Sequence, residues 1–462
     1  MASQGDSVRM DGWKAIARYL GRDRTTAMRW AASRGLPVHR LPGGRRASVY
    51  AVGEELDAWL SSTPLDRADD PPRGPLNRRT MLALGGIGAV AAAGGLGAVL
   101  LRRPAMSPEV AALLDQARVL RGQNTRETQD QAIGLAHRAV QMEPGNADAW
   151  GMLAYARASA SRWRPENESR VLREQATTEA QHALDLDPAN ARAELALATA
   201  LPLMGRDNWL PRAAHLQRAL LHAPDDPDIL IEQAWIDRMT GHCRHAADMC
   251  QRVSARDFSP PLFNIWVRSL WSMGRLAEME RKLAEGMALF PSNKMLWFTR
   301  LELLVFSGRA EQAAVLAGDV TGRPSTVSEA EAETMVQLAR GVLGNDSTAT
   351  NPYFNALKEK ARDLVRAAID CIRFAAVSGW IDDAFALTDA YFFDRGFRVG
   401  GNNGGGLFIA RNQRASNFLF EPTAAAMRTD ARFGALTEEL GLEAYWREAR
   451  RPPDYRAEVT PA

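Results

Sequence analysis

The sequence of 462 residues contains only three cysteines and very few lysines. Three cysteines in a chain of this length exclude a small fold held together by disulfide bonds. The formal net charge of +2 excludes a strongly basic or acidic chain, and 46% hydrophobic with 24% charged residues excludes a wholly disordered one. A mean hydropathy of −0.28 excludes a membrane protein with many spans, although not one with a single span.

Recognisable catalytic motifs are missing as well. The sequence contains no His-Glu-x-x-His, Gly-x-Ser-x-Gly, Cys-x-x-Cys or Walker motif. The glycine cluster 400–406 lacks the Lys-Ser/Thr ending of a phosphate-binding loop and is predicted to be a surface loop. The best candidate metal ligands are His242, Cys243, His245 and Cys250, but no acidic ligand is evident beside them. We therefore expect no metal site, no cofactor and no enzymatic activity.

The charges that are present are distributed unevenly along the chain. Residues 1–60 carry ten Arg or Lys and six Asp or Glu, a net charge of +4. Residues 61–106 carry six Arg and three Asp, a net charge of +3, which leaves −5 for the remainder. A basic front end and a mildly acidic body predict different partners for the two ends.

The longest apolar run, Met81–Leu101, has 21 residues without a charged or strongly polar side chain. A helix of this length is roughly 31 Å long, close to the hydrocarbon thickness of a bilayer. A buried core helix would normally show a polar stripe, which this run lacks. The sequence therefore predicts a transmembrane helix over 78–103, with the lipid bilayer as a partner. Because Arg78-Arg79 resembles a twin-arginine export signal, insertion by that route and by the Sec route both stay open.

Residues 8–61 are predicted to form a compact domain ahead of a linker at 62–77. The pattern predicts a helix from Trp13, a second helix after Asp23, strands at Val38–Leu41 and Ser48–Ala51, and a closing helix at Glu54–Leu60. The turn between the two strands carries two arginines. Helix, turn, helix and hairpin in this order indicate a winged helix-turn-helix domain.

Three stretches of this domain, Trp13–Gly21, Arg24–Trp30 and Gly35–Arg40, together with the arginine-bearing hairpin, resemble the MerR/excisionase superfamily. The resemblance covers about 50 residues and implies that the domain binds double-stranded DNA. MerR regulators continue into a long dimerisation helix, whereas a Pro/Asp-rich linker follows here. Dimerisation would therefore have to come from elsewhere in the chain, and a homodimer is left open.

The charge pattern supports DNA binding independently of the resemblance. Ten Arg or Lys residues lie between Arg9 and Arg46, against two aspartates. Cations on a helix face and on an adjacent hairpin can contact base edges and phosphates together. The candidates for contacts in the groove are Arg24, Thr25, Met28 and Arg29, and those for phosphate or minor-groove contacts are Arg45 and Arg46. The alternative is a solvated face or a protein-binding surface, since the whole chain is rich in arginine.

From residue 107 the chain repeats one phrase, an amphipathic helix that ends before a proline and a small polar turn. The phrase occurs at 139–146, 183–190, 219–226 and 287–293. Pro188 and Pro224 are 36 residues apart, and the next steps, through Phe258, are 34 and 33 residues. A period near 34 with paired helices resembles tetratricopeptide repeats, which implies an α-solenoid over 107–320 with a groove for a protein or peptide. Residues 321–462 are predicted to be a helical extension and cap.

The sequence as a whole predicts a mainly α fold class: a small winged helix-turn-helix domain, a single transmembrane helix and a tetratricopeptide-like solenoid. This organisation predicts a membrane-anchored one-component transcriptional regulator, single-pass in the inner membrane, with its N-terminus cytoplasmic and its repeats extracytoplasmic. The alternative function is a membrane-anchored repeat scaffold for protein–protein interaction that does not bind DNA.

Overall fold

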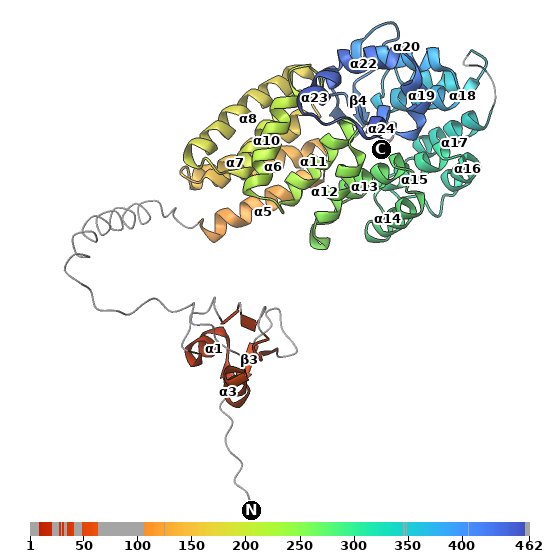
Figure 1. Ribbon diagram of the computed structural model, residues 1–462. Coiled ribbons are helices and arrows are strands. Elements are labelled where there is room, and N and C mark those ends of the chain that lie inside the picture. The colour runs from red at the N-terminus through yellow and green to blue at the C-terminus, as the bar shows by residue number, and fades with distance from the viewer. Residues whose placement is uncertain are drawn as a thin grey trace, which may run out of the picture. The chain divides into compact units, whose positions relative to one another are not determined.

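The computed structural model describes residues 9–20, 27–28, 30–31, 35–40, 49–62, 106–123, 125–344, 347, 349–404 and 406–457. These residues belong to two compact units, one within Met1–Arg103 and one within Pro104–Ala462 (Figure 1). Each unit is described by itself below.

The N-terminal unit combines a small sheet with helices. Its elements are β1 (Arg9–Asp11), α1 (Trp13–Tyr19), β2 (His39–Arg40), β3 (Val49–Val52) and α3 (Gly53–Ser62). The three strands are antiparallel in the order β1-β3-β2. Ile16, Ala51 and Leu56 are fully buried, and the rings of Trp30 and Trp59 pack with their centroids 5.7 Å apart. These few apolar side chains form the core of the unit.

The fold class predicted above is corrected in two respects. No winged helix-turn-helix is shown: the described residues form a three-stranded sheet whose first strand, β1, the sequence pattern did not predict. None of the described helices is long and apolar enough to span a bilayer, and even the 21-residue α8 (Glu166–Leu186) carries charged side chains along its length. The run Met81–Leu101 lies outside the described residues. The same finding contradicts the predicted single-pass location, with its cytoplasmic N-terminus and extracytoplasmic repeats.

The second unit begins with eight consecutive pairs of helices. The first four pairs are α5 (Pro108–Gly122) and α6 (Arg126–Met142), α7 (Ala147–Ser161) and α8, α9 (Ala191–Ala200) and α10 (Trp209–His222), and α11 (Pro227–Met239) and α12 (Cys243–Arg252), followed by the 3-10 turn η2 (Ala255–Asp257). The next four are α13 (Pro260–Ser272) and α14 (Leu276–Leu289), α15 (Lys294–Phe306) and α16 (Ala310–Gly318), α17 (Glu329–Leu343) and α18 (Pro352–Lys360), and α19 (Val365–Val377) and α20 (Ile381–Phe393). The predicted tetratricopeptide-like helical repeat is therefore confirmed.

The repeated proline phrase has a local physical cause. Pro144 follows the end of α6, where a missing N–H costs nothing to the helix that has stopped. Asn146 then accepts hydrogen bonds from the backbone N–H groups of Asp148 and Ala149, at 3.0 and 3.2 Å, and so caps α7. Asn190 caps α9 in the same way through the N–H of Ala193, at 2.8 Å. One short phrase thus ends one helix and begins the next.

Small side chains let neighbouring helices approach closely. Ala154 in α7, Ala180 and Ala183 in α8 and Ala193 in α9 are all fully buried in one continuous core. Gly286 in α14 faces the ring of Phe263, and a Cβ at this position would lie 2.7 Å from the ring. The many alanines therefore allow the helices to pack closely, and they add little apolar volume to the core.

The remaining residues, 394–404 and 406–457, are called the C-terminal segment. Its elements are β4 (Asn402–Gly404), β5 (Leu407–Phe408), η3 (Arg411–Gln413), η4 (Asn417–Phe420), η5 (Pro422–Ala424), α21 (Ala425–Thr429), α22 (Arg432–Glu439), α23 (Leu442–Glu448) and α24 (Asp454–Ala457). The segment does more than cover the last repeat. Its backbone bonds to the α7–α8 turn at Trp163, to the α9–α10 turn at Met204 and to the α11–α12 turn at Gly241. After α20 the segment therefore returns to the α7–α8 turn and then follows the repeats forward to the α11–α12 turn.

Candidate protein-binding face

The first helices of the pairs form an inner layer. Along the chain α5 contacts α7, α7 contacts α9, α11 contacts α13, and α13 contacts α15. Each second helix packs against its own partner and the next first helix, as α6 does against α5 and α7. This arrangement is typical of a helical solenoid, and the face that the first helices form is here called the inner face. Its N-terminal half is formed by α5, α7, α9 and the first turns of α11, and its C-terminal half by the last turn of α11 together with α13, α15, α17 and α19.

The N-terminal half is held together by ion pairs that converge on α11 and the residue before it. Each of the three preceding first helices, or the turn after it, supplies one arginine. The pairs are Arg121 with Asp228, Arg162 with Glu232, and Arg192 with Asp226. The guanidinium of Arg121 also lies 4.4 Å from the ring centroid of Tyr155, within the range of a cation–π contact. These pairs, which are 107, 70 and 34 residues apart in sequence, thus join the first four repeats.

A polar pocket of about 440 Å³ opens on this half of the inner face. Its lining combines residues of α5, of α9, of the turn into α11 and of η2: Asp115, Arg118, Arg192, Asp226, Pro227, Arg256 and Asp257. Arg192 donates to Asp226 at 2.8 Å, while Arg118 lies 3.7 Å from Asp257. The side chain of Arg256 is 85% exposed. The pocket therefore offers fixed charges of both signs to a ligand.

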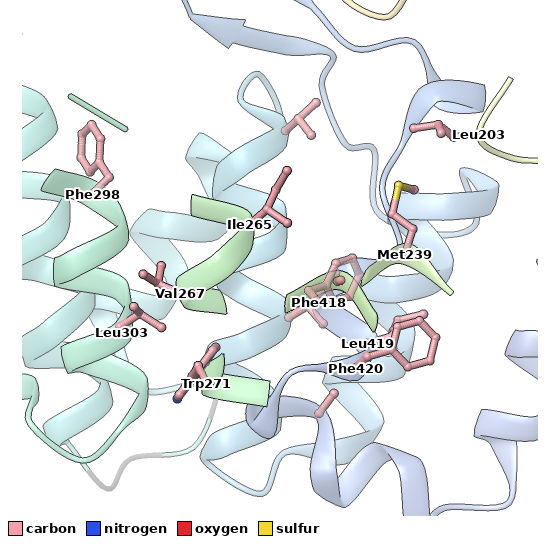
Figure 2. Close-up of a cluster of buried hydrophobic side chains, with 14 of the residues drawn as sticks. Leu203, Met239, Ile265, Val267, Trp271, Phe298, Leu303, Phe418, Leu419 and Phe420 are labelled. Atoms are coloured by element: carbon pink, nitrogen blue, oxygen red, sulfur yellow. The ribbon is translucent and has the colours of Figure 1, made fainter. Parts of the chain in front are cut away.

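The C-terminal half is occupied by the C-terminal segment. Phe418, Leu419 and Phe420 of η4 lie beside Met239, at the end of α11 (Figure 2). The next residue, Glu421, is 0% exposed and binds three arginines of the repeats. They are Arg238 in α11 at 3.0 Å, Arg268 in α13 at 3.5 Å and Arg373 in α19, whose Nε donates at 2.9 Å. One carboxylate of the segment therefore joins three repeats.

The charge of Glu421 is maintained by these arginines. Burial alone would raise its pKa, but the charges of Arg373, Arg268 and Arg238 outweigh burial and hold the pKa below its ordinary value. Glu302 of α15 shares Arg268 and Arg373, and the pKa of Glu302 is likewise lowered. The pKa of Asp370 is raised, first by burial and then by the charge of Glu302. The interior of this half therefore contains a network of buried charges in addition to its apolar core.

The residues that were predicted to bind DNA are mostly outside the described part of the chain. Met28 is described: it is 43% exposed, in a helical stretch where Ala27 and Trp30 are buried. The residues that lie outside are Arg24, Thr25, Arg29, Arg45 and Arg46. DNA contact through this set therefore stays a prediction.

The four candidate metal ligands have other environments. His245 Nδ1 lies 2.6 Å from a carboxylate oxygen of Asp237, and His242 Nδ1 lies 2.8 Å from the hydroxyl of Thr240. Cys243 and Cys250 are buried, and burial raises the pKa of Cys243 to about 11. In the described residues no group of three His, Cys, Asp or Glu side chains is placed to hold a metal ion.

Comparisons with known proteins add similarities of fold only. No family model matches the chain, and no curated protein matches it. Among solved structures, a structure titled as the functional characterisation of Pseudomonas aeruginosa pilF is 15% identical, covers 54% of this chain and 93% of that chain, and has a TM-score of 0.32. A tetratricopeptide repeat protein from Parabacteroides merdae is 14% identical, covers 61% of this chain and 99% of that chain, and has a TM-score of 0.35.

Proposed function

We propose that this chain is a protein-interaction scaffold, acting by binding rather than by catalysis, whose partner binds the N-terminal half of the inner face. The observation that carries the proposal is the difference in cover between the two halves. The C-terminal segment fills the C-terminal half, whereas in the N-terminal half it bonds to the turns after α7 and α9, and a pocket of about 440 Å³ opens beside α5 and α9. A concave layer of stacked helices with an accessible pocket is the usual binding surface of helical repeats.

The lining of the pocket favours a polar, charged segment of the partner. Three acidic and three basic side chains surround Pro227. Five of these six charges already pair with one another and the two signs balance, so a partner gains by matching the pattern of signs rather than by neutralising a net charge. We therefore expect an extended peptide with neighbouring acidic and basic residues, bound with modest affinity and with salt-dependent specificity.

The test starts from a random peptide library displayed against the full chain. Selected peptides are titrated against the wild type and against a variant with Arg118→Glu and Arg256→Glu, which reverses two charges at the pocket. Arg170→Glu reverses an exposed charge on α8 that does not line the pocket, and serves as the control. Peptides that bind the wild type and the control but lose at least tenfold affinity for the double variant support the proposal. Equal affinity for all three proteins contradicts it.

A second candidate function, DNA binding by the N-terminal unit, is favoured by one specific observation. Met28 is exposed while Ala27 and Trp30, on the same helical stretch, are buried in the core. The stretch therefore turns one face outward within a segment that carries ten Arg or Lys residues between 9 and 46. We propose that this segment contacts double-stranded DNA, with Arg24, Thr25, Met28 and Arg29 at the bases and with Arg45 and Arg46 at the phosphates.

An electrophoretic mobility shift with the full chain tests this second proposal. Arg45→Ala with Arg46→Ala is expected to weaken binding to all sequences alike and to reduce the salt dependence, because phosphate contacts are lost. Arg29→Ala is expected to relax base preference by about 1–3 kcal/mol if it contacts a base through two hydrogen bonds. Arg170→Ala, on α8, is the control for a lost charge. Unchanged binding in both sets of variants removes DNA as a partner.

A further inference from the structure

Arg212 is a fully buried cation without an acidic partner among the described residues. It extends from α10, and its exposed fraction is 0%. Nη2 donates to the carbonyl oxygens of Leu201 and Pro202, both at 2.7 Å. Nε and Nη1 have no acceptor within the described part of the chain. A guanidinium is rarely buried completely without a counter-charge, because its desolvation costs several kcal/mol.

The charges nearest to Arg212 do not neutralise it. Arg162 and Glu232 interact with it electrostatically, but both terminal nitrogens of Arg162 already donate to the Glu232 carboxylate. Burial raises the pKa of the nearby Tyr445, so that phenol stays neutral. Burial first, and then the charge of Arg162, lower the pKa of Arg212 to about 9, which still leaves it protonated at neutral pH. The Trp209 ring, whose centroid lies 5.2 Å from the guanidinium carbon, adds a cation–π contact but no negative charge, so one positive charge remains without an acidic partner.

The C-terminal segment bonds to the same turn through its backbone and carries buried side-chain amides without partners beside that bond. Gln413 is buried, and neither its amide nitrogen nor its amide oxygen has a partner among the described residues. The side-chain oxygen of Asn412 also has no hydrogen-bond partner among the described residues. The backbone oxygen of Asn412 accepts from the N–H of Met204 at 2.9 Å, in the α9–α10 turn that Arg212 also binds. Buried polar groups without partners are rare, and each one calls for an explanation.

We propose that Arg212 and Gln413 bind a small monovalent inorganic anion of the halide class, enclosed between the α9–α10 turn and η3. One uncompensated positive charge requires one negative charge. Because Arg212 is not exposed at all, the carboxylate of a partner protein cannot reach it in the folded state, whereas a single small ion can be enclosed as the chain folds. Guanidinium and amide N–H groups are the donors that such an ion accepts.

Thermal unfolding of the full chain tests the proposal directly. The Tm is measured in sodium chloride and in sodium gluconate at the same ionic strength, so that screening is equal in both series. A halide that binds the folded state alone is expected to raise the Tm by about 2 °C for each tenfold increase above its Kd. Gluconate, which is too large to be enclosed, is expected to give no such rise. Coincident curves in the two salts overturn the proposal.

Two variants locate the effect. Arg212→Met removes the cation and is expected to abolish the difference between the salts, while Arg206→Met, at an exposed arginine of the same turn, is expected to keep it. Gln413→Glu supplies a negative charge from the chain itself and gives a second measurement in case Arg212→Met does not fold. This variant is expected to have a raised Tm in gluconate and no response to chloride. A Gln413→Glu protein that still responds to chloride overturns the proposal.

Discussion

The two halves of the inner face are built from the same kind of helix, but the charges of their buried arginines are neutralised in different ways. In the N-terminal half, arginines from α5, from the turn after α7 and from α9 bind acids of α11 and of the residue before it, so both partners belong to the repeats. In the C-terminal half, three arginines bind Glu421, which comes from the C-terminal segment. A layer that neutralises itself keeps its surface accessible. A layer whose counter-charge comes from another segment is covered by that segment.

The cover of the C-terminal half is too stable to be exchanged for a partner. Phe418, Leu419, Phe420, Tyr445 and Trp446 of the segment are all buried in the core of the repeats. Five such side chains contribute on the order of 10 kcal/mol through burial alone, as much as the whole free energy of folding of many domains. A peptide of micromolar affinity gains less than this on binding. The segment therefore acts as part of the fold, and the accessible surface lies in the other half.

The largest expected effect is that of Glu421→Gln. The change removes the only negative charge that the segment supplies to Arg238, Arg268 and Arg373 among the described residues, and leaves these buried arginines without it. Breaking a buried ion pair from one side typically costs about 3–5 kcal/mol. Urea unfolding of the full chain measures the loss.

Glu439→Gln is the matched control for this change. Glu439 lies in the same segment and pairs with Arg395, but both side chains are well exposed. We expect its cost to stay within about 1 kcal/mol. Similar costs for the two variants would show that the cover does not depend on the buried charge, and the distinction between the halves would fail.

The next prediction tests whether the C-terminal segment excludes water from the α11–α12 turn. His242 is buried there, with Nε2 3.2 Å from the backbone oxygen of Arg451 in the C-terminal segment. Burial first, and then the charge of Arg451, lower the pKa of His242 to about 4 from an ordinary value of 6.5. Above pH 6.5 the histidine is neutral in both states and costs nothing. As the pH falls from 6.5 to 4, the unfolded chain binds a proton that the folded chain does not, and about 3 kcal/mol of stability is lost.

His242→Gln is expected to remove this part of the acid dependence. The free energy of unfolding is compared between wild type and variant at several pH values, so that other titrating groups cancel in the difference. His222→Gln, at an exposed histidine of α10, is the control and is expected to follow the wild type. A difference between wild type and His242→Gln that does not change with pH would mean that this turn is open to water.

Local signals account for the part of the fold that the sequence predicted. The proline phrase predicted the ends and caps of the repeat helices because each cap involves residues two or three positions apart, as Asn146 and Ala149 show. The pairing continues beyond residue 320, through α17–α20, although no proline phrase marks it there. Where a rule depends on neighbours in sequence, the sequence alone was sufficient.

The functional features escaped prediction because they depend on distant residues. Arg121 and Asp228 are 107 positions apart, and Arg238 and Glu421 are 183 apart. In a chain rich in arginine, nothing distinguishes the buried arginines from those on the surface. The only local signal was Glu421 itself, an acid directly after the apolar stretch 418–420. The transmembrane and winged helix-turn-helix predictions failed for the opposite reason, because each extended a local resemblance to a whole fold.

A smaller effect is expected from Arg121 in the N-terminal half. Arg121→Met leaves Asp228 with one of its two arginine partners, Arg192, whose Nη1 lies 3.7 Å away. Since this pair is less buried than Glu421, we expect a cost of about 1–3 kcal/mol. The swap Arg121→Asp with Asp228→Arg restores a pair and is expected to recover part of the loss in urea unfolding. An equal loss of stability in the single variant and in the swap would show that packing of Arg121 on Tyr155, rather than its charge, stabilises the contact between α5 and α11.

The smallest effect on stability is expected at the pocket, and this is where binding is expected to change most. The side chain of Arg118 is 39% exposed and lies 3.7 Å from Asp257, so screening by water leaves the pair worth at most about 1 kcal/mol. Arg118→Ala is therefore expected to unfold in urea almost as the wild type does, while its affinity for library-selected peptides falls. Glu421→Gln, measured under conditions where it is still folded, is expected to keep that affinity. The opposite result, with peptide binding lost in Glu421→Gln and kept in Arg118→Ala, would place the binding surface in the covered half and reverse the comparison.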